Sequence, residues 1–370
     1  MNILHIGSGN IGKGLIFPVL QESNQITSFT FLDIDNKMIN FINEIKTIEI
    51  NFFEDKTNTK KKYTNYQGFT FNEILKSENS YILEKIDMIT ISIGQENLIH
   101  IVDSMKKILD VIKKPIIIMC CENGYKVSSY FQQLLKINQK NIYFVDCIID
   151  RIIPNQLFYE TKIINTENYY SWICNENQWP LTIQKINTLK YTKNIDNEIY
   201  IKMCMLNGVH SVLTWHRFMV DKFIQTDSVC EALQIVDTKI FISKYLVEMA
   251  EIISKKLNVD YDKLHHYGET VIKRFMNPRI DDKLSRVGRN PITKLNSNER
   301  VASPLLYAIN NDMNCSYLKI AFKNGLLYSY KQDQQAVLLN KDILNFGIIY
   351  ALNSHFNFTA DEVNNLKNIF

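Results

Sequence analysis

The stretch Asn2-Ile-Leu-His-Ile-Gly-Ser-Gly-Asn-Ile-Gly12 decides the fold of the first half of the chain. It joins a short apolar run to the spacing G-x-G-x-x-G, although the whole chain of 370 residues holds only 12 glycines. Between a strand and a helix, the first glycine permits a tight turn, the second lets a pyrophosphate approach the backbone, and the third lets the helix pack on the strand. The N–H groups that open the helix then face the phosphates. The sequence therefore predicts a dinucleotide site made by Gly7, Ser8, Gly9, Asn10, Ile11 and Gly12.

An acidic residue follows the second apolar run, Ser28–Leu32, where such a site requires one. Asp33 lies about twenty residues past the glycines, and a carboxylate there accepts hydrogen bonds from the adenosine ribose. Because a carboxylate repels a 2′-phosphate, the cofactor is expected to be NAD and not NADP. A turn residue that caps the strand is the alternative for Asp33, and Asp35 is the second candidate for the acid. Gly94 is the next expected backbone contact, although a simple turn explains it nearly as well.

Short apolar runs alternate with segments of helical period through the first half, which predicts an α/β fold with a Rossmann-type doubly wound sheet. The expected strands are Asn2–Ile6, Ser28–Leu32, Met88–Ile93, Pro115–Cys120 and Ile142–Ile148. The polar, lysine-rich segment Thr47–Phe71 interrupts this rhythm and is expected to be a solvated insertion, or else an interaction surface.

From about Tyr191 onward helical period dominates. We expect an NAD-binding domain over residues 1–190 and a mostly α-helical substrate and catalytic domain over residues 191–370. Ser228–Asn258 has apolar residues at helical spacing, Asp260–Met276 begins with a good cap, and Thr359-Ala-Asp-Glu362 is a capping-box sequence that opens a last short helix.

Composition excludes several functions. A net charge of +3 is too small for an extended nucleic-acid surface. The seven cysteines include no C-x-x-C pair, which indicates reduced thiols and neither a disulfide framework nor a zinc site. No basic leader and no apolar run of about 18 residues indicates export or membrane insertion. We expect a cytoplasmic protein with a small-molecule substrate, no metal, no nucleic-acid or membrane partner, and a monomeric or homodimeric state.

Three polar side chains interrupt an otherwise apolar stretch of the second half: Lys202, Asn207 and His210. On an α-helix at about 100° per residue, positions i, i+5 and i+8 share one wedge. Such a face is costly to bury unless it lines a cavity or meets partners. An apolar or cationic neighbourhood lowers the pKa of a lysine, which suits it as a base in alcohol oxidation. A surface position for Lys202 and a satisfied core position for His210 are the alternatives.

These motifs, in this order, resemble the mannitol-1-phosphate 5-dehydrogenases of the polyol-specific long-chain dehydrogenase family over nearly the whole chain. The resemblance is carried by His5–Gly14, Cys121–Asn123, Val145–Pro154, the set of Lys202, Asn207 and His210, and Arg286–Leu295. It departs mildly at Lys13, where an arginine is common, and at the basic segment near residue 60.

The resemblance implies a metal-independent reaction in which Lys202 is the general base for the substrate hydroxyl, and the general acid in the reducing direction. Asn123 and Asn207 would hold the reacting oxygen, and His210 would orient substrate and lysine. By the same analogy Asp150 contacts a sugar hydroxyl. A buried ion pair with Arg151 is the alternative for Asp150.

The segment between Arg274 and Arg300 is rich in cations and is expected to bind the substrate phosphate. The candidates are Arg286, Arg289, Lys294 and Arg300, with Arg274, Arg279 and Lys283 in the same segment. An exposed basic loop is the alternative. The expected reaction is D-mannitol 1-phosphate + NAD⁺ ⇌ D-fructose 6-phosphate + NADH. A tagaturonate or fructuronate reductase, with a carboxylate in place of the phosphate, and a non-catalytic NAD(H)-binding regulator are the alternatives.

Overall fold

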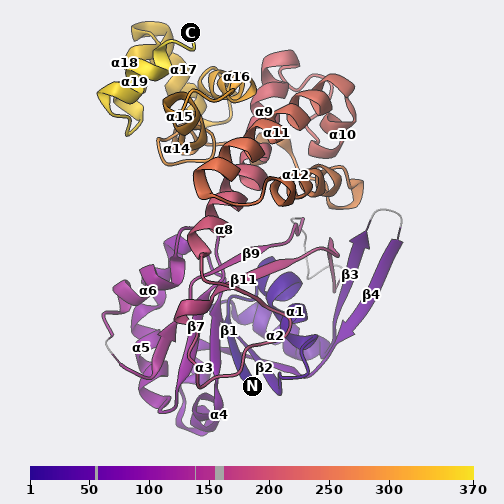
Figure 1. Ribbon diagram of the computed structural model, residues 1–370. Coiled ribbons are helices and arrows are strands. Elements are labelled where there is room, and N and C mark those ends of the chain that lie inside the picture. The colour runs from indigo at the N-terminus through magenta and orange to yellow at the C-terminus, as the bar shows by residue number, and fades with distance from the viewer. Residues whose placement is uncertain (55–56, 138, 155–161) are drawn as a thin grey trace. The chain divides into compact units, whose positions relative to one another are not determined.

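The computed structural model describes residues 1–54, 57–137, 139–154 and 162–370 (Figure 1). The chain divides into two compact units, Met1–Glu198 and Ile199–Phe370. The first contains all the described strands, and the second is almost entirely helical. The predicted fold class is therefore confirmed. Within the described ranges, no helix is long and apolar enough to cross a membrane.

A six-stranded sheet forms the centre of the first unit, and every strand pairing in it is parallel. In spatial order its strands are β5 (Tyr66–Thr70), β2 (Ser28–Asp33), β1 (Asn2–Ile6), β6 (Met88–Ile91), β7 (Ile116–Cys120) and β8 (Ile142–Phe144). The chain runs outward from β1 in both directions, so the strand order reverses between β1 and β6. Ligands of open α/β sheets bind at the carboxyl ends of the strands at such a reversal. Gly7 follows β1 and Gly94 lies shortly after β6, at this edge.

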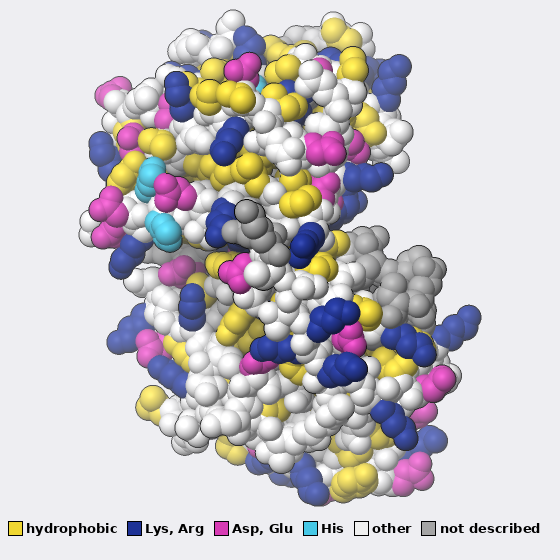
Figure 2. All heavy atoms as spheres, turned by 90° about the vertical axis from the view of Figure 1, so that its right-hand side faces the viewer, with side chains coloured by type: hydrophobic (Ala, Val, Ile, Leu, Met, Phe, Trp, Pro, Cys, Tyr) yellow, Lys and Arg dark blue, Asp and Glu magenta, His cyan; other side chains and the backbone are white. Residues whose placement is uncertain are grey.

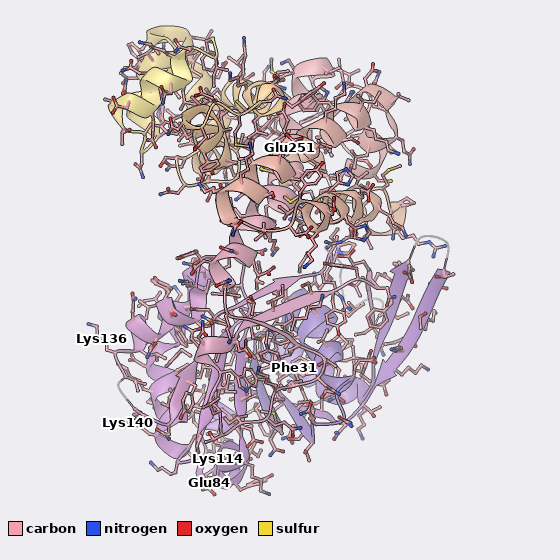
Figure 3. All side chains as sticks on the ribbon, in the orientation of Figure 1. Phe31, Glu84, Lys114, Lys136, Lys140 and Glu251 are labelled. Carbon is pink, nitrogen blue, oxygen red and sulfur yellow. The ribbon has the colours of Figure 1, made fainter. Side chains whose placement is uncertain are left out.

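Helices cover both faces of this sheet (Figure 1). They are η1 (Gly12–Ile16), α1 (Phe17–Gln21), α2 (Asn36–Ile45), α3 (Phe71–Ile74), η2 (Ser77–Asn79), α4 (Ser80–Lys85), η3 (Gln95–Ile101), α5 (Val102–Val111) and α6 (Val127–Leu135). Ile3 packs in the core cluster that contains α1 and α2, whereas Leu4 and Ile6 pack in the cluster that contains α5 and α6. This alternation follows from the two-residue period of a strand. Figure 3 shows Phe31 inside this unit, and Lys136 and Lys140 at its outside.

The segment Thr47–Phe71 is not simply a solvated insertion. It contains β3 (Ile48–Glu54), β4 (Thr57–Tyr63) and the whole of β5. β3 pairs antiparallel with β4 and parallel with β10 (Ile163–Glu167), in a separate three-stranded sheet. The alternate residues Ile48, Ile50 and Phe52 are buried, so only the outer strand β4 is solvated, as the composition predicted. Three exposed lysines on β4 form ion pairs: Lys60 and Lys62 with Glu49, and Lys61 with Glu22.

The predicted strand Ile142–Ile148 is two strands in different sheets. β8 ends at Phe144, and β9 (Cys147–Asp150) pairs with β11 (Ser171–Asn175) beside β12 (Lys190–Thr192); η4 (Glu176–Gln178) follows β11. Between them lies Asp146, whose buried carboxylate accepts hydrogen bonds from Ser129 N (2.9 Å), Ser129 Oγ (2.5 Å) and Gln178 Nε2 (3.0 Å). A buried carboxylate requires such donors, and the chain leaves the main sheet where it meets them.

The helical unit begins within α8 (Ile195–Ile201). The following helices are η5 (Lys202–Asn207), α9 (Gly208–Asp221), α10 (Val229–Gln234), α11 (Val236–Leu257), α12 (Tyr261–Phe275), η6 (Pro278–Ile280), α13 (Leu284–Val287), α14 (Pro291–Lys294), α15 (Ala302–Asn310), α16 (Ser316–Leu326), α17 (Gln334–Phe346), α18 (Ile348–His355) and α19 (Ala360–Lys367). The Asp260 side chain caps α12 and Thr359 forms the predicted capping box. The single helical run predicted for Ser228–Asn258 is divided into two helices at Ile235, whose backbone is extended.

On the face drawn in Figure 2, basic side chains are interspersed with acidic ones, as the small net charge leads one to expect. All seven cysteines are buried and free.

Candidate active site

The three glycines of the motif have different surroundings. Gly7 has φ +105°, and a Cβ there would lie 2.3 Å from Ser92 O, so the turn itself requires glycine. A Cβ on Gly12 would lie 2.2 Å from Gly7 O, because the helix packs closely on the loop. Gly9 is exposed, and a Cβ there would meet no protein atom within 4 Å. The fold does not explain the absence of a side chain at Gly9, whereas the close approach of a pyrophosphate does.

The rest of the loop is held by the second strand. Ser8 is buried, and its backbone N and its Oγ donate to Asp33 Oδ2 at 2.6 and 2.5 Å. Asn10 and Ile11, both half-buried, open the helix that continues as η1. Gly7 N donates to Leu32 O at 2.9 Å. The loop is therefore fixed before any ligand binds.

Asp33 retains room for a ligand. Its other oxygen, Oδ1, accepts one described bond, from Asp35 N at 3.0 Å, and a carboxylate can accept about four bonds in all. Asp35 instead caps α2, since its Oδ1 accepts from Lys37 N (2.9 Å) and Met38 N (3.1 Å). Of the two acids, Asp33 is therefore the better placed to accept hydrogen bonds from a ligand.

Gly94 and Asn123 follow the neighbouring strands β6 and β7. Gly94 has φ +90° and opens η3, and its N donates to Glu122 Oε1 at 2.6 Å. Burial raises the pKa of the Glu122 carboxyl, while this amide lowers it. Asn123 is exposed in the loop that follows β7. Both predicted residues thus lie at the carboxyl edge of the sheet.

Asp150 ends β9 and is buried. The guanidinium of the next residue, Arg151, donates to the carbonyls of Gly14 (2.9 Å), Tyr169 (3.1 Å) and Asn168 (3.3 Å). It also lies over the rings of Phe52 and Tyr170 at 5.2 and 5.1 Å. Burial lowers the pKa of Arg151 to about 10. Arg151 therefore binds two other backbone segments, at Gly14 and at Asn168–Tyr169.

Lys202 and Asn207 lie on a π-helical turn, not on the α-helix that sequence periodicity assumes. Gly208 N donates to Met203 O, the i to i+5 bond of such a turn. Residues five apart then lie one turn apart on the same side, so the two side chains are closer in direction than an α-helix would place them. π-Turns within α-helices are frequent at functional sites. His210, in α9, stacks on Phe275 with ring centroids 3.9 Å apart.

Lys202, Asn207 and His210 are all partly buried. The polar side of the helix is therefore neither fully exposed nor sealed in the core. A half-buried amine beside an amide and an imidazole can bind and orient a small polar molecule and exchange a proton with it.

The cations of the loop after α12 are only partly available. Arg286 donates through Nε to Asp282 Oδ1 at 2.6 Å, and Arg300 Nε donates to Glu299 Oε2 at 3.0 Å. Arg289 is exposed, and no hydrogen bond of its side chain is found in the described part of the chain. Of the other cations, Arg274 is buried in α12, and Arg279 and Lys283 are exposed.

Lys294 is strongly perturbed. Burial, with the positive charges of Arg300 and Arg289, lowers the pKa of its amine to about 7, against the opposite effect of Asp333 and Glu299. Its Nζ donates to Val287 O at 2.7 Å. The positive charges of Arg289 and Arg300 therefore both act on the amine of Lys294. An anion placed among them would be stabilised by all three.

Two family models together match most of the chain. The mannitol dehydrogenase Rossmann domain matches residues 1–188, and the mannitol dehydrogenase C-terminal domain matches residues 194–354. The chain belongs to the mannitol dehydrogenase family. Membership confirms the resemblance drawn from the motifs and the expected enzyme class, so the chain is an NAD-dependent oxidoreductase with a Rossmann domain.

Among mannitol dehydrogenase relatives, the mannitol-1-phosphate 5-dehydrogenase of Mycoplasma mycoides subsp. mycoides SC is 34% identical over 331 residues, which are 89% of this chain and 98% of that protein. A substrate-free D-sorbitol dehydrogenase has the same fold, with a TM-score of 0.75 at 13% identity over 98% of this chain and 91% of the other. Mannitol 2-dehydrogenase of Pseudomonas fluorescens, solved as a ternary complex with NAD and D-mannitol, has a TM-score of 0.71 at 13% identity. The match covers 100% of this chain and 91% of the other.

Sequence reasoning missed one group in this chain, the buried amine of Lys13 behind the glycine loop. The available signal was a single charge inside the apolar run that follows the third glycine. Within the described ranges, no group of three or more His, Cys, Asp or Glu side chains is arranged to hold a metal ion.

Proposed function

We propose that this member of the mannitol dehydrogenase family interconverts D-mannitol 1-phosphate and D-fructose 6-phosphate with NAD. The observation that supports the choice of a phosphorylated substrate is that the positive charges of Arg289 and Arg300 both act on the amine of Lys294. They belong to the same helical unit as Lys202. The name of the Mycoplasma mycoides relative, which aligns over nearly its whole length, supports the same substrate.

Residues 1–190 would bind the cofactor. The fit rests on the open side of Gly9, the tight turn at Gly7 and the remaining acceptor capacity of Asp33 Oδ1. Asn10, Ile11 and Gly94 would supply further backbone contacts at the same edge. When bound, NAD accepts a hydride from the carbinol carbon in one direction, and NADH returns it in the other.

Residues 191–370 would supply the acid–base chemistry. Lys202 takes the proton of the substrate hydroxyl as the hydride leaves the same carbon, and returns it during reduction. Asn207, one π-turn away, and Asn123 donate hydrogen bonds to the oxygen as negative charge develops on it. His210, whose ring is fixed by Phe275, orients the substrate beside the lysine. No residue in this scheme requires a metal ion.

Binding of the substrate would use two kinds of group. Arg289, Lys294 and Arg300 hold the phosphate, and Arg286 contributes to the positive potential although Asp282 occupies its fork. Asp150 accepts a hydrogen bond from a sugar hydroxyl. A phosphate dianion neutralises cations that repel one another in the free protein, which favours it over a neutral sugar.

Spectrophotometric NADH consumption tests the proposal, with fructose 6-phosphate, fructose, tagaturonate and fructuronate as parallel substrates. We expect fructose 6-phosphate to have the largest kcat/KM, by at least about a hundredfold over fructose, since two charge-assisted contacts contribute about 3 kcal/mol or more. A larger kcat/KM for either hexuronate would assign the basic cluster to a carboxylate. NADH binding without turnover of any of the four would indicate a regulator.

A further inference from the structure

We propose that Lys13 is a positioning residue that directs the backbone N–H of Gly9 toward the cofactor pyrophosphate. The inference rests on the NAD-binding site proposed above and adds a group that does not itself touch the cofactor. Lys13 is 1% exposed, although lysine is rarely buried to this extent without a specific partner. It lies on η1, directly after the third glycine of the motif.

The amine of Lys13 has a defined place. Its Nζ donates a hydrogen bond to the carbonyl oxygen of Ser8 and lies 3.6 Å from Met38 Sδ. The carbonyl of Ser8 belongs to the peptide unit that joins Ser8 to Gly9. Lys13 therefore holds one edge of this peptide plane from inside the protein.

The geometry of a peptide fixes what the other edge does. In a planar trans peptide the C=O and N–H bonds point in opposite directions, and the chain contains no cis peptide among its described residues. The N–H of Gly9 therefore points away from Lys13. Gly9 is exposed and a Cβ there would meet no protein atom within 4 Å, so the space beside this residue is open to a phosphate.

Ser8 is fixed on its other side as well. Its backbone N and its Oγ both donate to Asp33 Oδ2, at 2.6 and 2.5 Å. Asp33 thus holds the N–H of the Gly7–Ser8 peptide and the Ser8 hydroxyl, while Lys13 holds the carbonyl of the Ser8–Gly9 peptide. Donation to the carbonyl also polarises the peptide, which strengthens its N–H as a donor to an anion. Without the ammonium, Asp33 still anchors Ser8, but the peptide plane loses its inner restraint.

The Lys13 amine changes its charge within the pH range in which enzymes are usually assayed. Burial lowers the pKa of its amine to about 8, against the opposite effect of Asp33 and Asp35. The charge of Lys13 also acts on His5, whose pKa burial lowers to about 3, so this imidazole stays neutral. Carboxyl groups ordinarily titrate near pH 4. Between about pH 7 and pH 9.5, Lys13 is therefore the group of this set that changes charge.

The direction in which NADH affinity changes with pH follows from the linkage between binding and protonation of Lys13. A bound pyrophosphate stabilises the ammonium and so raises the pKa of Lys13 above about 8. Affinity for NADH is then greatest where Lys13 is protonated in the free protein, and it falls as the pH rises through about 8.

The test measures NADH binding by fluorescence titration at about pH 7 and about pH 9.5, for wild type, Lys13→Met and Lys13→Arg. Wild type should bind several-fold more weakly at the higher pH. Lys13→Met should bind about tenfold more weakly than wild type at pH 7, equivalent to about 1.4 kcal/mol, with little dependence on pH. Lys13→Arg, whose guanidinium does not titrate, should bind tightly at both pH values.

These readouts separate positioning from general loss of structure, because a destabilised loop would weaken binding equally at both pH values. Equal NADH affinity of wild type and Lys13→Met at pH 7 would overturn the proposal. So would a wild-type affinity that does not change with pH, which is informative even if neither variant folds. The substrate is absent from these titrations, so their outcome is independent of whether fructose 6-phosphate is turned over.

Discussion

Substitution of Gly9 by alanine should separate cofactor binding from folding. A Cβ on Gly9 would meet no protein atom within 4 Å, and the backbone of Gly9 is not among those with positive φ. The folded state therefore tolerates the methyl group without strain. Since alanine also restricts the unfolded chain, the free energy of unfolding should stay the same or rise by about 0.4–1 kcal/mol.

The same methyl group occupies the side from which the pyrophosphate approaches. An added methyl in a close contact costs about 1–3 kcal/mol. At about 1.4 kcal/mol per factor of ten, Gly9→Ala should bind NADH about five- to 150-fold more weakly than wild type. Fluorescence titration with NADH and thermal unfolding without ligand measure the two effects separately.

Gly7→Ala is the matched control. Its Cβ would lie 2.3 Å from Ser92 O, at a φ of +105°. Strain and overpacking together should lower the free energy of unfolding by about 2–6 kcal/mol. Unchanged NADH affinity in Gly9→Ala would refute the assignment of this glycine to the pyrophosphate. A large loss of stability in Gly9→Ala would refute the account of its open surroundings.

Three further substitutions test other parts of the site. Lys202→Ala should lower kcat for fructose 6-phosphate by about a thousandfold or more while the NADH dissociation constant changes little, because a positioned base contributes this much; wild-type kcat would remove Lys202 from the mechanism. Lys294 should lose its charge as the pH rises through about 7, the value to which burial and the charges of Arg300 and Arg289 lower its pKa. The KM for fructose 6-phosphate should therefore increase about tenfold from about pH 6.5 to about pH 9 in wild type, because one charge-assisted hydrogen bond is lost. It should stay nearly constant in Lys294→Arg, whose guanidinium does not titrate. The same rise in both proteins would contradict a role for this amine. Arg151→Met should lower the free energy of unfolding by about 3 kcal/mol or more in urea titrations, since three carbonyls lose a charged donor; a change under about 1 kcal/mol would contradict it.

The sequence predicts the glycine loop well because local steric rules decide it. Gly7 and Gly12 leave no room for a side chain, and Asp33 ends β2 at the expected distance. The sequence does not reveal that Asp33 also binds Ser8, because that contact depends on how β1 and β2 lie side by side in the sheet.

The sequence-based predictions of strands were wrong where residues far away in the sequence determine the strand pairing. β3 finds its partner β10 more than a hundred residues later, so the lysines of β4 dominated the local pattern and hid the buried alternation of Ile48 and Ile50. In the sequence, the apolar run that begins at Ile142 is interrupted only by Asp146. Ser129 and Gln178 donate hydrogen bonds to the carboxylate of Asp146, and the predicted strand divides into two at this residue.

In the candidate site, the types of residue can be predicted from the sequence, but their ion pairs and their burial cannot. The number of cations after α12 indicates an anion site, yet only the structure reveals that Arg286 is bound by Asp282 and that burial lowers the pKa of Lys294. Likewise the helical wheel assumes 3.6 residues per turn, and a π-turn does not follow from that rule.

The wide turn at Lys202–Asn207 has a consequence for how this segment tolerates change in length. Deleting one residue between Lys202 and Asn207 would let the chain relax into an ordinary α-helix without loss of either functional group. Residues four apart in an α-helix also lie about one turn apart, so the amine and the amide would stay on the same side of the helix. A one-residue deletion in this turn should therefore preserve more activity than a one-residue deletion between Asn207 and His210, which would rotate the imidazole by about 100° relative to the other two groups.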